Sequence, residues 1–456
     1  MDNNKDLFET MPVSRALARL AVPTIISQLI TMVYNLADTF FIGSTKDPYK
    51  VAAATLAYTL FFILNALSNL FGIGGGSLIS RLLGDGKPEE AKKVCSFSFY
   101  GSIFVALLYS VFCLLFMEPL LNLLGASPYT MDYAAGYTFW VVVIGGLPAM
   151  LSLTMSHLLR SEGYASQASF GLGMGGILNI ALDPLFMFVL LPAGQEVTGA
   201  AIATMLSNVA ALCYFAVVFF RLRNSTVLSV APGRILSGAR YAGTIFAVGF
   251  PSAIGNLLSC VSNMVINKLA SGYGDIPVAA LGIVKKIEML PMNVGMGLCQ
   301  GMLPLVAYNY AAKNFRRMKE TVRKASLSGM GFAVLCVIVF ELFARTSIQV
   351  FIDDPDTIAM GMVFLRINCL ATPLMICNFH ISFMFQAVGK GPQSLVVACC
   401  RTGIVQIPLL FLMNAVVGLS GLAWTQVISD AVTLVIALLL YRRFLRSFEP
   451  AQKLGR

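Results

Sequence analysis

The sequence predicts an all-α integral membrane protein with twelve transmembrane helices. We expect two six-helix lobes related by a pseudo-two-fold axis along the membrane normal. First, 57% of the 456 residues are hydrophobic and only 12% are charged, whereas a soluble chain has about 25% charged residues. Second, apolar runs long enough to cross a bilayer as helices recur along the chain. Third, the second half of the chain repeats the motifs of the first half in the same order.

Each spanning helix is expected where an apolar run lies between polar or turn-forming segments. The mean hydropathy of the chain, +0.78, leaves room for many such runs. The polar opening segment MDNNKDLFETMPVSRAL lacks a basic n-region, a short apolar core and a cleavage site, so we expect no removable signal peptide. The predicted spans are residues 16–43, 52–80, 95–117, 132–159, 166–191, 197–221, 239–270, 277–310, 321–344, 357–386, 393–417 and 420–441.

The basic residues follow the alternation of the predicted loops. Most of the 32 Lys and Arg residues lie in loops after even-numbered helices or in the C-terminal tail, as in the segment 313–324. Loops after odd-numbered helices hold only Lys46, Lys50 and Arg345. This bias predicts that both termini lie in the cytoplasm, for a multi-pass protein of the bacterial cytoplasmic membrane. We therefore attribute the net charge of +10 to topology rather than to nucleic-acid binding.

The internal repeat is weak but runs through both halves. The segment AVPTIISQLITMVYN (21–35) resembles VGFPSAIGNLLSCVSN (248–263), and VTGAAIATMLSN (197–208) matches LSGLAWTQVISD (419–430). Two copies of a six-helix unit have the same orientation in the membrane and enclose a central cavity. The predicted domains are therefore an N-terminal lobe, residues 1–225, and a C-terminal lobe, residues 226–456. The basic segment around 222–240 is expected to be a hinge-like linker.

Acidic side chains inside the membrane mark the first half. Asp38 and Asp183 each lie within a long apolar segment, and their repeat equivalents are Ile266 and Ile407. An ionisable group costs a few kcal/mol or more at the centre of a bilayer and by default marks an ion or substrate path. We therefore predict a transporter whose cation site lies in the N-terminal lobe, with only that lobe contributing the acid.

A polar stripe follows the first helix. Its members recur at spacings of four and three residues, which places them on one helical face that must meet protein or a water-filled cavity. The seventh helix repeats the stripe without the final acid, so both halves are expected to line one polar cavity. The two stripes are Thr24, Gln28, Thr31, Asn35 and Asp38, and Ser252, Asn256, Ser259 and Asn263.

The fifth helix carries a second candidate cluster. Asn179 and Asp183 lie one turn apart, immediately before Pro184. Because proline lacks an N–H, a backbone carbonyl is freed about one turn earlier. A carboxylate, an amide oxygen and a free carbonyl suit a proton or a hard cation, and the sixth helix adds Thr204 and Asn208. The alternative is an Asp–Asn pair that only satisfies two packed helices.

Other polar residues in apolar helices leave alternatives open. His157 and His380 are either packed, hydrogen-bonded residues or members of a proton relay. Lys285, Lys286 and Glu288 lie early in the eighth helix, where an i, i+3 pair can neutralise part of their charge. For these three we favour a structural or gating role.

Two glycine-rich strings resemble nucleotide-binding motifs but lack their context. GLGMGG (171–176) lies inside an apolar span with no preceding strand, and GIGGGS (72–77) has no P-loop lysine. We interpret Gly171 and Gly175 as positions of close helix packing. The ten cysteines show no CxxC spacing, so we expect neither disulfides nor a zinc site. We expect no enzyme activity and no cofactor.

Four motifs together resemble the MATE (multidrug and toxic compound extrusion) family. They are NLADTFFIG in the first helix, the NxxxDP pattern of the fifth, GAAIAT of the sixth and QGMLPLVAYNYAAKNFRRMKE after the eighth. The resemblance covers about residues 10–445. The NorM-like branch of this family carries further acids in its C-terminal half, and we assign none here. The chain therefore looks closer to the DinF-like bacterial branch.

The resemblance implies a twelve-helix antiporter that exports cationic or amphipathic compounds in exchange for H+ or Na+. It places the cation site at Asp38, Asn179, Asp183 and Thr204, and a bend of the first helix at Pro23. It also adds Tyr34 and Tyr137 to the cavity. The expected substrate cavity is therefore formed by Gln28, Thr31, Tyr34, Asn35, Tyr137, Asn208, Asn256 and Asn263.

The mechanism that follows is a hypothesis about helix bending. Two carboxylates in one low-dielectric pocket disfavour each other's charge and titrate as a pair. Binding of H+ or Na+ at Asp38 and Asp183 is expected to bend the first helix and release the drug outside. We expect a monomer in the lipid bilayer. The alternatives are a flippase for lipid-linked glycans or, in another class, a channel or an intramembrane enzyme.

Overall fold

The computed structural model describes residues 2–192, 194–223 and 226–447, and every regular element in these ranges is a helix. The N-terminal lobe and linker contain α1 (Asp2–Glu9), α2 (Val13–Ser44), α3 (Pro48–Gly84), α4 (Pro88–Leu115), α5 (Met117–Leu124), α6 (Met131–Thr138), η1 (Phe139–Ile144), α7 (Gly146–Ser161), α8 (Ala165–Leu185), η2 (Phe186–Leu190), α9 (Glu196–Leu222), η3 (Pro232–Arg234) and α10 (Ile235–Ala239). The C-terminal lobe contains α11 (Ala242–Ser271), α12 (Asp275–Ala311), α13 (Phe315–Leu342), α14 (Ala344–Gln349), α15 (Pro355–Cys369), α16 (Ala371–Ala387), α17 (Gly391–Cys399), η4 (Cys400–Ile404), α18 (Gln406–Val417) and α19 (Leu419–Arg446).

Twelve membrane spans account for these helices. Ten helical segments of the described chain are individually long and apolar enough to cross a bilayer. Two further spans are bent pairs: α6 with η1 joins α7 at an angle of 49°, and α15 joins α16 at 41°. Bent helices are tolerated at membrane depth where neighbouring helices satisfy the freed backbone groups. The prediction of an all-α, twelve-helix protein is confirmed.

Several helices begin at side-chain caps in the loops between spans. Asp47 precedes α3 and accepts a hydrogen bond from the Tyr49 N–H at 2.9 Å. Asp354 caps α15 in the same way, through the Thr357 N–H at 2.9 Å. These caps satisfy N–H groups that have no partner within the helix. The turns that separate successive spans are thereby encoded locally.

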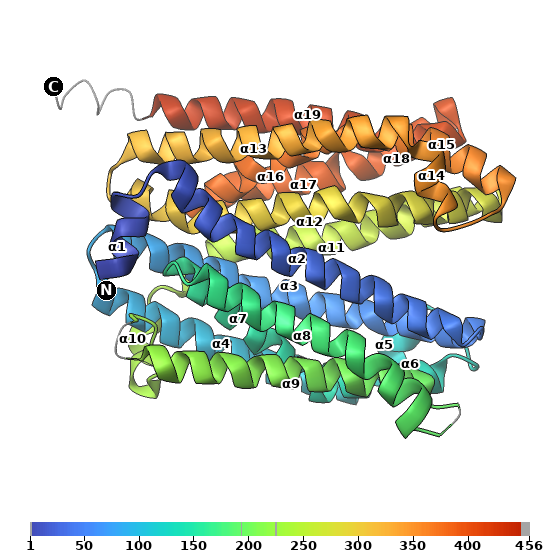
Figure 1. Ribbon diagram of the computed structural model, residues 1–456, viewed down its shortest axis with the longest axis horizontal. Helices are drawn as coiled ribbons and strands as arrows, with labels where there is room; N and C mark the ends of the chain where they lie inside the picture. Colours follow the sequence, from blue (N-terminus) through green and yellow to red (C-terminus); the bar gives the residue numbers. More distant parts are fainter. Residues whose placement is uncertain (1, 193, 224–225, 448–456) are drawn as a thin grey trace.

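The two lobes meet along four helices. In Figure 1, α2 lies between α8 of its own lobe and α12 of the other lobe, and α3 likewise packs on α11. Glycine permits this approach at the end of the molecule that carries α1. A Cβ added to Gly301 would lie 2.5 Å from Cα of Ala21, and one added to Gly249 would lie 2.1 Å from the Leu70 carbonyl oxygen. The lobes are therefore closely packed at this end, and Figure 1 shows α2 and α12 diverging toward the opposite end.

Hydrogen bonds join the lobes at the same closed end. Arg160 on α7 donates from Nη1 to Oε1 of Gln300 on α12 at 3.1 Å. The Ser77 hydroxyl donates to the main-chain carbonyl of Gln386 at 2.6 Å. In addition, Arg317 on α13 donates from Nε to the Phe8 carbonyl at 2.7 Å, which ties the N-terminal segment to the C-terminal lobe.

The predicted packing role of two glycines in α8 is confirmed. The string 171–176 lies inside this continuous helix. A Cβ at Gly171 would lie 2.6 Å from the Phe215 ring, and one at Gly175 would lie 3.3 Å from Cβ of Ala211. Both neighbours belong to α9, so the glycines allow α8 and α9 to approach closely.

The linker between the lobes lies against the N-terminal lobe. Ser96 on α4 donates to the Ser229 carbonyl at 2.8 Å. The Glu162 carboxylate, in the loop between α7 and α8, accepts from the Val227 N–H at 2.7 Å and from the Thr226 hydroxyl. Burial raises the pKa of Glu162 from 4.5 to about 7, although these two hydrogen bonds act in the opposite direction. The linker is thus fixed to the loop between α7 and α8 through a buried carboxyl group.

Candidate cation and substrate site

The polar stripe of α2 divides between two cavities of the N-terminal lobe. Gln28, Thr31 and Tyr34 line a cavity of about 240 Å³. Further along the helix, Asn35 and Asp38 line a second cavity of about 230 Å³. Leu36 and Ile42 of α2 also line the second cavity, and the periodicity of α2 presents four polar residues of the stripe, together with Tyr34, to the two cavities, as the spacing predicted.

The fifth and sixth spans form the centre of the site. Asn179 and Asp183 lie on one face of α8, and the Asn179 amide donates to Asp183 Oδ1 at 3.2 Å. The same amide donates to the hydroxyl of Thr204 on α9 at 3.1 Å. Asp183 is fully buried, with 0% of its surface exposed. The structure therefore brings together Asn179, Asp183 and Thr204, as predicted.

Asp38 lies close to this cluster from the side of α2. It lies within electrostatic reach of Asp183, and Tyr34 on the same helix is within reach of both acids. Tyr137, on α6, is buried and lines the cavity of Asp38. The four residues predicted for the cation site thus belong to one neighbourhood that joins α2, α8 and α9.

Three oxygen atoms of this neighbourhood lack hydrogen-bond partners among the described residues. They are Oδ1 of Asp38, Oδ1 of Asn179 and Oδ2 of Asp183, all buried. A buried acceptor without a donor is costly, and more so when it belongs to a carboxylate. Carboxylate and amide oxygens are ligands for hard cations, and a carboxylate is also a proton acceptor. The arrangement is suited to bind a proton or a small cation.

The cavities are also lined by polar residues that the sequence analysis did not place in the site. Asn65 and Asn69 on α3 line the 240 Å³ cavity, together with Gln300 from the C-terminal lobe. Tyr58 and Lys286 line the 230 Å³ cavity with Asp38. Tyr58, Asn65 and Asn69 share helical spacing, so the polar-stripe argument used for α2 would have found them on α3.

Some predicted residues lie outside these two cavities. Thr24 is fully buried, and its hydroxyl donates to the Leu20 carbonyl of its own helix at 2.8 Å. Asn208 does line the larger cavity. Asn256 and Asn263 on α11 line neither of the two, and Asn263 instead accepts a hydrogen bond from Lys285 at 2.8 Å. We predicted one cavity lined by both stripes. Neither of these two cavities has that lining.

The two histidines differ in their surroundings. His157 lines the 240 Å³ cavity and also a small cavity of about 20 Å³ at the seam between the lobes. His380 is buried within α16, where Nδ1 lies 2.7 Å from the Ile376 carbonyl of the same helix. The packed interpretation fits His380, while His157 has access to the polar cavity.

The C-terminal lobe contains a buried acid that the sequence analysis did not assign. Asp430, near the middle of α19, has 0% of its surface exposed. Its Oδ1 accepts from Nε of Arg401 at 2.8 Å. The signal was present in the repeat, because LSGLAWTQVISD places Asp430 opposite Asn208 of the first copy. The sequence analysis compared only the positions of Asp38 and Asp183 and therefore missed it.

The fold and the buried polar site define a multi-pass membrane transporter with two six-helix lobes. A model of the MatE family matches residues 23–185 and, again, residues 251–412. The chain therefore belongs to the MatE family, and the two matches correspond to the two halves of the repeat. The lobe boundary at residues 225 and 226 stays a prediction.

Similar proteins whose names are known support the assignment to this family. The chain is 32% identical over 433 residues to the multidrug export protein MepA of Staphylococcus aureus, covering 95% of this chain and 94% of the relative. It is 30% identical, with the same coverage, to MepA of Staphylococcus saprophyticus. Among solved structures, a MATE protein crystallised in the bent conformation has a TM-score of 0.89 at 25% identity, covering 99% of both chains. An outward-facing MATE family transporter of the MOP superfamily has a TM-score of 0.89 at 24% identity, covering 98% of this chain and 99% of that one, which concerns the fold alone.

Proposed function

We propose that this protein is a secondary active antiporter that exports cationic or amphipathic compounds in exchange for H+ or Na+. The observation that carries the proposal is the group of three buried oxygens without partners, on Asp38, Asn179 and Asp183. A bound proton or cation would compensate the burial of these oxygens. The multidrug export activity named for the relatives with about 30% identity supports the choice of cargo.

The shape of the molecule supports alternating access. The lobes are packed together at the end that carries α1, where glycines bring their backbones into contact. Basic loop residues such as Lys87 and Lys313 follow the helices that end there, α3 and α12. The positive-inside bias assigns this end to the cytoplasm, so we assign the described conformation to the outward-open state, with both termini cytoplasmic.

In this mechanism the cation and the cargo compete through α2. This helix carries Gln28, Thr31 and Tyr34 into the larger cavity and Asp38 into the smaller one. Neutralisation of Asp38 and Asp183 removes their mutual repulsion and changes how α2 packs, which weakens the hold on the cargo. The proline at position 23 allows α2 to bend. A membrane potential adds about 2.3 kcal/mol per charge per 100 mV to the entry of each cation.

The test is ethidium flux in proteoliposomes under a pH gradient and, separately, a Na+ gradient. Wild type is compared with Asp38→Asn and with Asp132→Asn, the same change at an exposed acid on α6. We expect flux driven by one of the gradients in wild type and in Asp132→Asn, and at least a tenfold loss in Asp38→Asn. Wild-type flux in Asp38→Asn would remove the acid from the mechanism. Flux that depends on neither gradient in all three proteins would contradict the coupling of export to H+ or Na+.

A further inference from the structure

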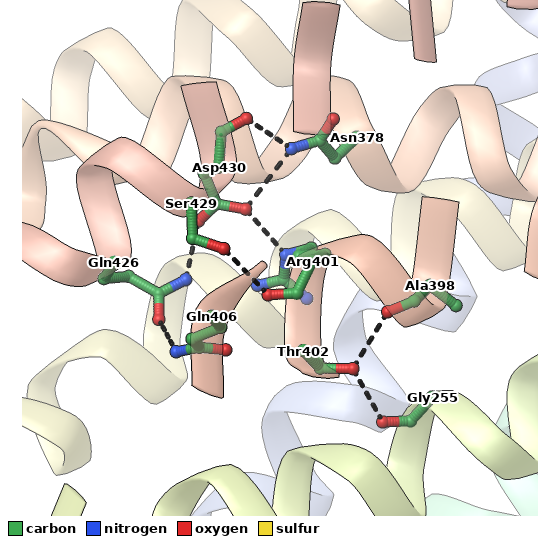
Figure 2. Close-up of polar contacts among 9 residues, drawn as sticks. All are labelled: Gly255, Asn378, Ala398, Arg401, Thr402, Gln406, Gln426, Ser429 and Asp430. Carbon is green, nitrogen blue, oxygen red and sulfur yellow. Dashed lines mark hydrogen bonds and ion pairs between the residues drawn. The ribbon is translucent and has the colours of Figure 1, made fainter. Parts of the chain in front are cut away.

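The buried acid of the C-terminal lobe is surrounded by donors. Oδ1 of Asp430 accepts from Arg401 Nε at 2.8 Å and from the Asn378 amide at 3.3 Å. Oδ2 accepts from the Gln426 amide at 2.6 Å, and Gln406 in turn donates to Gln426 at 2.7 Å. Figure 2 shows this network, with Asp430 at its centre. Both carboxylate oxygens therefore have hydrogen-bond donors, and the charge has a cationic partner.

Arg401 is itself held in place by three elements. It belongs to the π-helical turn η4, and its main-chain carbonyl accepts from the Ser429 hydroxyl of α19 at 3.2 Å. Its guanidinium carbon lies 4.5 Å from the centroid of the Phe379 ring of α16, a cation–π distance. Only 15% of its side chain is exposed. The Phe379 ring restricts the guanidinium, so less side-chain entropy is lost when it pairs with Asp430.

This pair occupies the interface that corresponds to the cation site of the N-terminal lobe. In that lobe the fifth and sixth spans, α8 and α9, meet at Asp183, and a π-helical turn, η2, follows directly. In the C-terminal lobe the eleventh and twelfth spans meet at Asp430, and a π-helical turn, η4, supplies Arg401; this turn precedes Ile407, the repeat equivalent of Asp183, and so is not the counterpart of η2. The first interface leaves carboxylate and amide oxygens without donors, whereas the second satisfies both oxygens of its carboxylate.

We infer that Arg401 acts as a built-in cation, which neutralises Asp430 permanently and thereby prevents the C-terminal lobe from exchanging an ion. The inference rests on the proposed function, because it assigns coupling to the N-terminal lobe alone. Arg401 is in this sense a specificity-determining residue: it limits the number of cations that accompany one transport cycle. Removing it leaves a buried carboxylate beside the unpartnered Oδ1 of Asn378, which is the composition of a cation site.

Glu288 on α12 faces this network, and Lys285 of the same helix is its neighbour. Glu288 lies within electrostatic reach of Arg401, Asp430 and Lys285. Lys285 donates to Asn263 of α11 at 2.8 Å. The four groups include two acids and two bases, so the cluster as a whole is neutral. Any test must separate a proton on Asp430 from a proton on Glu288.

The test compares Arg401→Gln with Arg401→Gln/Asp430→Asn, both in a background of Asp38→Asn/Asp183→Asn that silences the N-terminal lobe. The readouts are the infrared carbonyl band of a protonated carboxyl group at neutral pH, and the melting temperature in NaCl against N-methyl-D-glucamine chloride. We expect Arg401→Gln to gain either one protonated carboxyl group or a Na+-dependent rise in melting temperature, and the second aspartate change to remove it. If a folded Arg401→Gln protein shows neither gain, the inference is overturned. A carbonyl band that persists without Asp430 also overturns it, because that proton then belongs to Glu288.

A second variant covers the case in which Arg401→Gln does not fold. Replacing both partners by apolar residues, as in Arg401→Met/Asp430→Leu, leaves no unpaired charge. This variant is expected to keep the wild-type ratio of ions to cargo, and a ratio lower by one ion overturns the inference. The infrared and melting readouts do not depend on transport. They can therefore support Arg401 as an internal cation even if the flux experiment contradicts the proposed antiport.

Discussion

The two lobes are copies of one six-helix unit, yet they treat a buried acid in opposite ways. In the N-terminal lobe, Asp183 is fully buried and receives a donor on only one oxygen, from Asn179. In the C-terminal lobe, Asp430 is equally buried but is paired with Arg401 and bonded on both oxygens. The difference teaches that depth in the membrane does not by itself assign an ion-coupling role. The hydrogen-bond and ion-pair partners of the acid decide whether its carboxylate is free to bind an ion.

The same backbone plan permits both outcomes because each lobe supplies the acid from a different helix. Asp183 belongs to the fifth span, while Asp430 belongs to the twelfth, opposite Asn208 in the repeat. The guanidinium comes from the eleventh span, the repeat equivalent of the fifth. Duplication therefore preserved the interface between these two spans, while substitutions changed which side of it carries charge.

The largest expected effect separates the lobes by transport. Asp183→Asn should lower gradient-driven ethidium flux at least tenfold, because it removes one of the two carboxylates proposed to bind the coupling ion. Arg401→Met/Asp430→Leu should retain at least half of the wild-type flux, because it removes a pair that exchanges nothing. Flux in proteoliposomes at equal protein density is the measurement. Equal losses in the two variants would contradict the division of roles.

A second prediction separates the lobes by stability. Asp430→Asn leaves the buried Arg401 guanidinium without its counter-ion, and breaking a buried ion pair costs about 3–5 kcal/mol. Asp183→Asn instead removes a buried charge with no paired cation, so its melting temperature should equal or exceed that of wild type. Thermal unfolding in one detergent, followed by tryptophan fluorescence, compares them. A melting temperature lowered more by Asp183→Asn than by Asp430→Asn would reverse the comparison.

A third prediction concerns the loop that holds the linker between the lobes. Because burial raises the folded pKa of Glu162 to about 7 from 4.5, the unfolded chain releases this proton first as pH rises. This group therefore lowers stability progressively between about pH 4.5 and 7, by at most about 3 kcal/mol. Glu162→Gln should gain melting temperature relative to wild type on going from about pH 5 to about pH 8.

The matched control for this pH dependence is Glu118→Gln, the same change at an exposed glutamate of α5. Its melting temperature should stay parallel to that of wild type across the pH range. A parallel curve for Glu162→Gln as well would show that the carboxyl group titrates at its ordinary value.

The smallest expected effect lies within the cation site. Thr204→Val removes the hydroxyl that accepts a hydrogen bond from Asn179 at 3.1 Å. One hydrogen bond of this kind contributes about 1 kcal/mol, which corresponds to roughly a fivefold weaker apparent affinity for the coupling ion. The control is Thr425→Val on α19, a buried threonine whose hydroxyl bonds only within its own helix, to Gly421 at 2.8 Å. Ion-concentration dependence of flux is the readout, and identical shifts in both variants would refute the assignment.

Much of the site was predictable because it depends on local sequence. The spacing of Asn179 and Asp183 places both on one face of a helix whatever that helix packs against, and α2 presents its polar residues in the order that periodicity requires. The partner on another helix was less accessible to this reasoning. Thr204 was offered as a polar residue of the sixth helix, and only the family resemblance joined it to the cation site; Tyr58, Asn65 and Asn69 were missed although they share the same kind of spacing.

Some residues have surroundings that differ from the prediction, because those surroundings depend on which helices pack together. Thr24 belongs to the polar stripe by spacing, but the packing of α2 at the closed end buries it completely. Its hydroxyl donates to a carbonyl of its own helix. Asn263 is the repeat equivalent of Asn35, but its side chain accepts a hydrogen bond from Lys285. Lys286 belongs to the C-terminal lobe but lines the cavity of Asp38, because α12 packs against α2.

The sequence by itself determined the spans, their number and the helical faces that carry polar groups. The physical reason is that a chain in lipid must satisfy its backbone within each helix, so hydropathy and periodicity suffice. Only the tertiary structure decided which polar groups neutralise one another. The pairing of Arg401 with Asp430 joins two different helices, and its consequence, a silent acid in one lobe and an available one in the other, depends on angles and distances that no local pattern encodes.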